Sequence, residues 1–213
     1  MRNDGNRSRS ELTIRGDGLQ THDPETLLHD GRFVRLARRG VWEYATRANA
    51  TGVVAVVAQH DDGRLVLIEQ SRPAVGACVV ELPAGLVGDE DAGESLLAAA
   101  QRELAEETGY TARKWARLDD AWSSPGLTDE RVTFFHAVGL WRDRAADEQG
   151  WGVDGEAINV HEIELTALPA QLATWRSSGT AIDMKLLAGL YAAAIPTERT
   201  HDEDESERTT QAQ

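Results

Sequence analysis

The side chains best suited to chemistry in this 213-residue chain are three glutamates that lie close together. Glu103, Glu106 and Glu107 are three and four positions apart, so a helix would place them on one face. Like charges at that spacing repel by roughly 0.2–0.5 kcal/mol per pair on an exposed helix. Mg²⁺ would relieve the repulsion, because it binds carboxylate oxygens together with substrate phosphates. Taken alone, however, the three residues fit an ordinary solvated helix better than a metal site.

The segment that carries these glutamates is expected to be a helix. Residues 95–107 consist mainly of Ala, Leu, Gln and Glu, which are good helix formers. Leu97, Ala100 and Leu104 recur at helical spacing and predict a buried stripe beside the acidic face. Gly109 then supplies the usual C-terminal stop.

The spacing around this helix forms a longer pattern. Gly88, Glu94 and Arg102 precede the glutamates at the offsets G-x5-E-x7-R-E-L-x-E-E-x-G, and Gly109 closes the pattern. It resembles the signature of the Nudix hydrolases, with every fixed position filled and Tyr110 as the departure, where an aliphatic residue is usual. The resemblance implies an α/β (α+β) fold, an α/β/α sandwich on a mixed sheet. It also implies hydrolysis of a nucleoside diphosphate linked to a second group, with Mg²⁺ or alternatively Mn²⁺ as cofactor.

The same resemblance assigns roles inside the signature. Glu103 and Glu107 would be the main metal ligands, assisted by Glu106 and by the backbone carbonyl oxygen of Ala84. Arg102 would orient the glutamates through ion pairs rather than touch the substrate. Glu106 is also an alternative general base.

A general base is expected outside the signature as well. Many enzymes of the resembled group use a glutamate on a loop after the core strands, and residues 154–158 resemble that loop. This makes Glu156 the candidate base, with Glu148 and Asp154 as nearby alternatives. A base that acts directly and one that orients water through a metal both fit the pattern.

Segments flanking the signature resemble those of one subgroup, the ADP-ribose pyrophosphatases and related nucleoside diphosphate sugar hydrolases. Residues 81–85 read Glu-Leu-Pro-Ala-Gly as in that subgroup, although Gly85 stands three residues before Gly88, where the signature begins. Pro125 lies in a Ser-Pro-Gly segment sixteen residues after Gly109, the spacing that marks the subgroup. An ordinary Pro-Gly turn before a strand is the alternative.

The resemblance adds Arg72 and Glu81 to the substrate site. Arg72 belongs to a Gln-Ser-Arg-Pro step at a strand end, where a guanidinium can grip a phosphate bidentately. The alternative is a surface arginine at a strand edge.

Trp42, Glu43 and Arg47 match a W-E-x-x-x-R arrangement of the resembled enzymes. There, this tryptophan and an aromatic residue of the preceding strand sandwich the adenine, one from each subunit. Phe33 and Trp42 would fill those roles here, with Glu43 and Arg47 offering polar contacts. Stacking is worth roughly 1–3 kcal/mol per base. Ordinary core or interface positions would explain both rings equally well.

The chain is expected to have four parts. Residues 1–24 and 197–213 are polar and are expected to be mobile. Residues 25–50 predict a small antiparallel β unit, too small to be stable alone, which would pack on the core or in a homodimer. Residues 51–196 would form the hydrolase domain. Its expected elements are a hairpin at 51–70, strands near 78–82, 115–119, 131–138 and 158–165, and helices at 95–107, 168–175 and 182–194.

Composition limits the partners and the compartment. The net charge of −14, from 36 acidic and 22 basic residues, argues against nucleic acid but allows a small phosphorylated substrate beside a metal. A single cysteine fits a reducing cytosol, and no apolar run is long enough to span a bilayer. We therefore expect a cytoplasmic enzyme with no membrane partner.

The function expected from these residues is hydrolysis of the pyrophosphate bond of ADP-ribose or a related ADP-sugar, giving AMP and a sugar phosphate. One alternative is the same chemistry on GDP-mannose, another sugar nucleotide or a dinucleoside polyphosphate. An alternative of a different class is a non-catalytic Nudix module that senses ADP-ribose.

Overall fold

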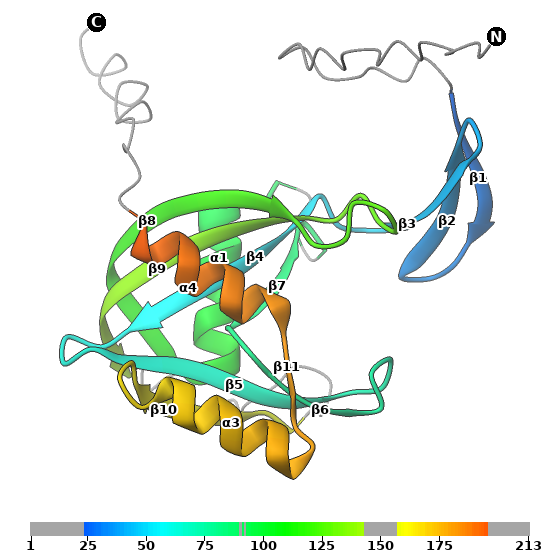
Figure 1. Cartoon of the computed structure of the whole chain (residues 1–213). Coiled ribbons are helices and arrows are strands. Elements are labelled where there is room, and N and C mark those ends of the chain that lie inside the picture. Colours follow the sequence, from blue (N-terminus) through cyan, green and yellow to red (C-terminus); the bar gives the residue numbers. More distant parts are fainter. Residues whose placement is uncertain (1–23, 90, 92, 143–156, 196–213) are drawn as a thin grey trace, which may run out of the picture.

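The computed structural model describes residues 24–89, 91, 93–142 and 157–195 (Figure 1). Expectations for residues 1–23 and 197–213, and for the loop that carries Glu148, Asp154 and Glu156, fall outside this part. Within it, no helix has the length and apolar character needed to cross a membrane.

A mixed sheet forms the body of the molecule, with strand order β11-β6-β5-β4-β9-β8, and with β10 on β5 and β7 on β4. The β4–β9 and β11–β6 pairs are parallel, and the other pairs are antiparallel. The strands are β4 (Gly52–Gln59), β5 (Arg64–Arg72), β6 (Ala77–Glu81), β7 (Ala84–Val87), β8 (Tyr110–Trp122), β9 (Arg131–Arg142), β10 (Asn159–Glu164) and β11 (Ala181–Ile182).

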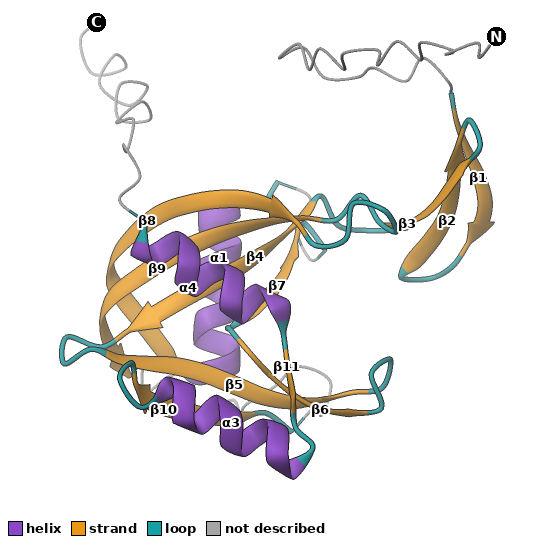
Figure 2. Cartoon of the chain, in the orientation of Figure 1, coloured by secondary structure: helices purple, strands orange, loops and turns teal. Residues whose placement is uncertain are grey.

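Helices cover both faces of this sheet, as Figure 2 shows. They are α1 (Leu96–Thr108), α3 (Leu168–Ser178) and α4 (Met184–Ala194). On β4 the two faces alternate, with Val54 and Val56 in the cluster beneath α1, and Val53 and Val57 in the cluster beneath α3 and α4. Both faces of β4 are therefore buried, which is why its sequence is continuously apolar. The expected mixed sheet with helices packed on it is confirmed.

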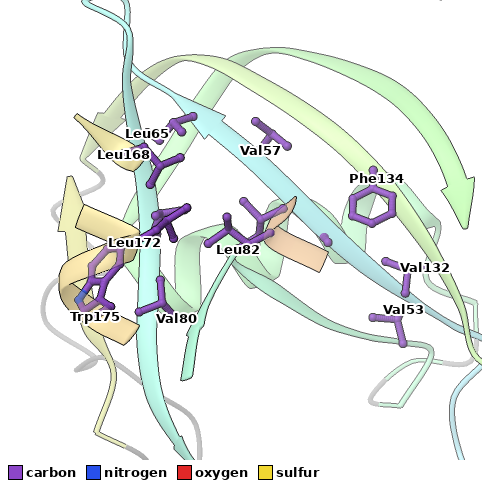
Figure 3. Close-up of a cluster of buried hydrophobic side chains, with 13 residues drawn as sticks. Val53, Val57, Leu65, Val80, Leu82, Val132, Phe134, Leu168, Leu172 and Trp175 are labelled. Carbon is purple, nitrogen blue, oxygen red and sulfur yellow. The ribbon is translucent and has the colours of Figure 1, made fainter. Parts of the chain in front are cut away.

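The larger core cluster lies between the sheet and the two C-terminal helices (Figure 3). Leu82, Phe134 and Trp175 pack there with the inward residues of β4 and β5. Gly189 lets α4 approach closely, because a Cβ there would stand 2.6 Å from Leu82 Cδ1. The cluster fixes the end of β6 and the turn into β7, from which the candidate site is built.

Helix α1 begins and ends within one residue of the range 95–107 that the sequence predicts. Ser95 Oγ accepts a hydrogen bond from the Ala98 amide at 3.1 Å, and Gly109 ends the helix in the left-handed region at φ 67°. Leu97, however, is exposed, so the expected apolar stripe is wrong at that position. The buried face instead uses Ala99 beside Ala100 and Leu104, because small side chains let the helix lie close to the sheet.

Several element boundaries differ from the sequence prediction. The strand expected near residues 115–119 begins at Tyr110, directly after the helix, because Tyr110 is itself buried in the sheet. Ile182 belongs to β11 rather than to the last helix, which starts after Asp183, whose side chain caps the Lys185 amide. The short strand β7 has no counterpart in the prediction.

Strands β1 (Glu25–Asp30), β2 (Val34–Arg39) and β3 (Trp42–Arg47) form the expected antiparallel unit, which extends away from the body in Figure 1. Its hydrogen bonds to the body go to one loop. The Ala45 amide donates to Leu127 O at 2.8 Å, and Thr46 Oγ1 donates to Asp129 at 2.9 Å. Large apolar side chains of this unit remain exposed, namely Leu27, Leu28, Phe33, Val34, Leu36, Val41 and Trp42.

Candidate active site

Strand β7 and helix α1 bring two of the three glutamates to the backbone of Ala84 and Gly85. Glu107 Oε2 accepts a hydrogen bond from the Ala84 amide at 2.9 Å. The Glu103 carboxylate lies against Gly85 so closely that a Cβ at that position would overlap it. Both glutamates are only 9 % exposed. A glycine at position 85 is therefore required by the approach of Glu103, not by its backbone angles.

Burial dominates the electrostatics of these two carboxylates. Desolvation raises the pKa of Glu103 to about 7, and Arg102 only partly offsets it. Desolvation raises the pKa of Glu107 to about 8 as well, opposed by the Ala84 amide and reinforced by the negative charge of Glu103. Both carboxylates therefore resist ionisation in the absence of a cation. A cation bound between them would stabilise the ionised form of each.

The donor set fits Mg²⁺ in its chemistry, since it consists of carboxylate and backbone oxygens. In the described part of the chain, no three His, Cys, Asp or Glu side chains are grouped as a metal site. Glu106, expected as an assisting ligand, shares Arg102 Nη1 with Glu103, at 3.1 and 2.8 Å. Glu103 and Glu107 are the two carboxylates that lie against the Ala84–Gly85 backbone, and water or substrate oxygens would complete a hexacoordinate ion.

Arg102 is the charge centre of the signature. Its guanidinium bonds to Glu94 at 2.9 Å, to Glu103 at 2.8 Å and to Glu106, and Nη2 donates to Leu86 O at 3.0 Å. These partners raise its pKa, with the Glu94 bond as the largest cause. Arg102 therefore ties the helix to strand β7 and orients acidic side chains.

Arg72 and Glu81 form a second ionic group beside the first. Arg72 binds the buried Glu81 carboxylate bidentately, at 2.6 and 2.9 Å. Lys185 Nζ lies 3.9 Å from the same carboxylate and 2.5 Å from Asp183. Arg72 is thus held at the predicted place, but by a carboxylate of the chain itself. Lys185 was missed by sequence reasoning, because only the pairing of β11 with β6 brings α4 to this point.

Trp42 and Pro125 lie together at a hollow of about 280 Å³, which we call the aromatic hollow. Its lining consists of Arg39, Trp42, Tyr44, Trp122, Pro125, Thr128 and Asp129. Phe33, predicted to share this role, does not line it, and its ring instead packs under the Arg32 guanidinium at 4.7 Å. Trp122 also lines the hollow, although it belongs to none of the sequence motifs.

Arg47 lines a neighbouring hollow of about 260 Å³, which we call the polar hollow. Its Nε and Nη2 donate to Glu130 Oε2 at 3.0 and 2.7 Å. Glu43 pairs with Arg38 across β2 and β3, is exposed, and lines neither hollow. Glu43 and Arg47 were both predicted to contact the adenine. In the structure, Arg47 lies beside the hollows and Glu43 lies away from them.

The predicted base Glu156 lies outside the described residues, but the strand that follows it is described. Asn159 pairs with Glu69 on β5, and the next residue, Ile68, pairs with Glu81. The described start of β10 therefore lies beside the part of β5 that precedes Arg72.

Comparison with known proteins agrees with this geometry. The family model for the NUDIX domain matches residues 48–181. The chain belongs to the Nudix family. The matched region runs from β4 to β11 and leaves out β1–β3 and α4. Trp42 and Lys185 thus lie on parts of this Nudix protein that the family model does not describe.

Named relatives of this Nudix protein include two kinds of pyrophosphatase. An ADP-ribose pyrophosphatase of Bacillus subtilis is 42% identical over 54% of this chain and 58% of its own length. A GDP-mannose pyrophosphatase of Yersinia pestis is 34% identical over 59% of this chain and 63% of its own length. The chain thus spans less than two thirds of either relative. A solved structure, an ADP compounds hydrolase, has a TM-score of 0.60 over 80% of this chain and 89% of its own, which at 18% identity shows the fold alone.

Proposed function

We propose that this Nudix protein hydrolyses the pyrophosphate bond of ADP-ribose or a related ADP-sugar with the help of Mg²⁺, or alternatively Mn²⁺. The observation that carries the proposal is the pair of buried carboxylates, Glu103 and Glu107, beside the Ala84–Gly85 backbone. The bound ion would lower the negative charge on the diphosphate and on the attacking water. The named ADP-ribose pyrophosphatase relative and the aromatic hollow support an adenine nucleotide as substrate.

The reaction consumes one water and needs no other reactant. Water forms a bond to one phosphorus, the bridging P–O bond breaks, and the bridging oxygen leaves with the other phosphate. The products are AMP and a sugar phosphate. Glu103 and Glu107 would hold the cation through their oxygens, with Ala84 adding its carbonyl oxygen.

Three other residues would position the reactants. Arg102 keeps Glu103 in place through its 2.8 Å contact. Glu156, our candidate base, would take the proton of the water, with Glu106 as the alternative within the signature. Arg72, which binds Glu81 bidentately, would also contact a phosphate of the substrate.

The first test is turnover of a substrate panel. Purified protein with Mg²⁺ is incubated with ADP-ribose, ADP-glucose, GDP-mannose and diadenosine polyphosphates, and the products are separated by chromatography. AMP and ribose 5-phosphate from ADP-ribose are the expected result. Preferential turnover of GDP-mannose would favour the second candidate, which the Yersinia relative supports. Absence of turnover across the panel would support the non-catalytic sensor.

The carboxylate pair is tested by Glu107→Gln. We expect turnover to fall by about 100-fold or more, since even an outer-shell change at a metal site typically costs 10–100-fold. The thermal unfolding midpoint of the metal-free protein should not fall, because glutamine keeps the shape of the side chain and is neutral at every pH. Glu164→Gln, at the exposed end of β10, is the matched control and should keep wild-type turnover. Retention of more than a few per cent of activity by Glu107→Gln would contradict the assignment.

We also propose that the protein works as a cytoplasmic homodimer. The exposed apolar side chains of β1–β3 support the dimer, since a three-stranded sheet with this surface gains stability from being covered. Phe33 does not line the aromatic hollow of its own chain. In the dimer, it would pack in the interface formed by the β1–β3 unit or line the aromatic hollow of the second subunit.

A further inference from the structure

Trp122 ends strand β8 with its large aromatic side chain exposed. It is the last residue of β8, pairs with Arg131 of β9, and is 56 % exposed. A large aromatic side chain left open to water needs a reason, because burying it would stabilise the protein by roughly 1.5–3 kcal/mol. Trp122 borders both the aromatic and the polar hollow, so its indole forms the wall between them.

The aromatic hollow is shaped for a flat group. The Trp42 indole, itself 59 % exposed, the Tyr44 ring and the Pro125 ring line it together with Trp122. Trp42 and Tyr44 belong to β3, Trp122 ends β8, and Pro125 lies in the loop that follows β8. A bridge between Ala45 and Thr128 joins β3 to this loop. Flat apolar faces that stay exposed around a hollow of about 280 Å³ suit a nucleobase, which stacks on aromatic rings.

Polar atoms at the rim agree with such an occupant. Asp129, whose Oδ2 accepts from Thr46 Oγ1 at 2.9 Å, also lines the hollow. A carboxylate oxygen accepts hydrogen bonds from amino or ring N–H groups, which nucleobases carry on their edges. Arg39 lies on the same lining, where its guanidinium pairs with Glu25 at 3.0 Å.

The two hollows lead toward the carboxylate pair. Gly52 and Val53 line the polar hollow, and Val53 pairs with Leu86 of β7, two residues from Ala84. Two strand residues span about 7 Å. A base beside Trp122 therefore leaves its diphosphate a short path across Val53 toward Glu103 and Glu107.

We propose that Trp122 stacks on the nucleobase of the substrate and determines how strongly a nucleoside diphosphate is preferred over a phosphate compound without a base. The inference rests on the proposed function, because it places the base of that same substrate. The sequence predicted that Trp42 and Phe33 stack on the two sides of the base. In this proposal, Trp42 and Trp122 of one chain take those places.

The test compares two ligands that differ in the base. Affinities for AMP and for ribose 5-phosphate are measured by calorimetry, with Mg²⁺, on wild type, Trp122→Ala, Trp122→Phe and Trp141→Ala. Trp141, on β9, is 42 % exposed and lines neither hollow, so its variant is the matched control. We expect Trp122→Ala to lower the affinity for AMP by about tenfold or more and to leave the affinity for ribose 5-phosphate unchanged. Trp122→Phe should keep most of the wild-type affinity for AMP, because it keeps an aromatic ring at this position.

Three results would overturn the inference. The first is an unchanged affinity for AMP in Trp122→Ala, and the second is an equal loss of affinity for AMP and for ribose 5-phosphate. The third is a shift of the monomer–dimer equilibrium of Trp122→Ala in sedimentation with no loss of affinity for AMP. That third result would assign the hollow to a second copy of the chain. Hydrolysis by wild type is measured separately. AMP binding that depends on Trp122 in a protein without turnover would sink the proposed function and keep the base site.

Discussion

At the scale of single residues, the carboxylate pair has two opposing demands. Glu103 and Glu107 must be buried to face Ala84 and Gly85, yet a buried carboxylate prefers its neutral form. The pKa values of about 7 and about 8 lie above the ordinary value of 4.5. The folded, metal-free protein therefore binds protons more tightly than the unfolded chain.

This predicts how pH changes the response to Mg²⁺. The stability contributed by the raised pKa values is present below pH 4.5 and is lost as pH rises through about 7 to 8. Bound Mg²⁺ replaces the protons, so the rise in unfolding temperature on adding Mg²⁺ should be larger at about pH 8.5 than at about pH 6. Calorimetric scans with and without Mg²⁺ measure it. An equal rise at both pH values, or a full rise in Glu107→Gln, would speak against a metal held by this pair.

At the scale of elements, two glycines allow two different close approaches. Gly85→Ala would push the Glu103 carboxylate away from β7. The displaced atoms belong to the end of the flexible Glu103 side chain, so the backbone can stay in place. We therefore expect turnover to fall by about tenfold or more, with the unfolding temperature nearly unchanged. Turnover and thermal unfolding measured on the same preparation check this, and a large loss of stability would contradict it.

Gly189→Ala should do the reverse. Its Cβ would stand 2.6 Å from Leu82 Cδ1 and 3.1 Å from Phe134 Cδ1, both in the packed core. Overpacking costs about 1–3 kcal/mol, and the better helix propensity of alanine returns about 1 kcal/mol. A net loss of up to about 2 kcal/mol in the free energy of unfolding is expected, with turnover retained per folded molecule. Denaturant titration measures the loss, and a more stable variant would show that α4 can shift.

Elements also mark the limit of what sequence could predict. The caps Ser95 and Gly109 act within one turn of α1, so local chemistry was sufficient to place the helix. Which face turns inward depends on the partner surface, and this is why Leu97 was misplaced. Lys185 reaches Glu81 across about a hundred residues of chain, and no local pattern signals that contact.

At the scale of the whole molecule, the fold and the signature followed from sequence because fixed spacings in the chain encode them. The walls of the aromatic hollow did not, since β3 and the loop after β8 meet only in the folded state. Sequence motifs indicated Trp42 and Pro125 separately, while Trp122 lies in no motif.

The assembly proposed from this surface can be tested directly. Replacing Leu27 and Phe33 together with glutamate should shift the protein from dimer to monomer, because charge then occupies the exposed apolar face of β1–β3. Analytical ultracentrifugation at assay concentration measures the shift. Leu165→Glu, an equally exposed position on the body, is the control and should leave the state unchanged. A wild-type monomer with full turnover would refute the dimer.

One short loop, residues 123–130, contacts both the N-terminal unit and the two hollows. It receives the hydrogen bonds from β3 through Leu127 and Asp129, and it lines both hollows. If a nucleotide occupies these hollows, its binding and the attachment of the N-terminal unit are thermodynamically linked. If pairing of two subunits holds that unit in place and so favours the nucleotide, reciprocity requires the nucleotide to favour pairing by the same factor. Substrate concentration would then set the assembly state of the protein.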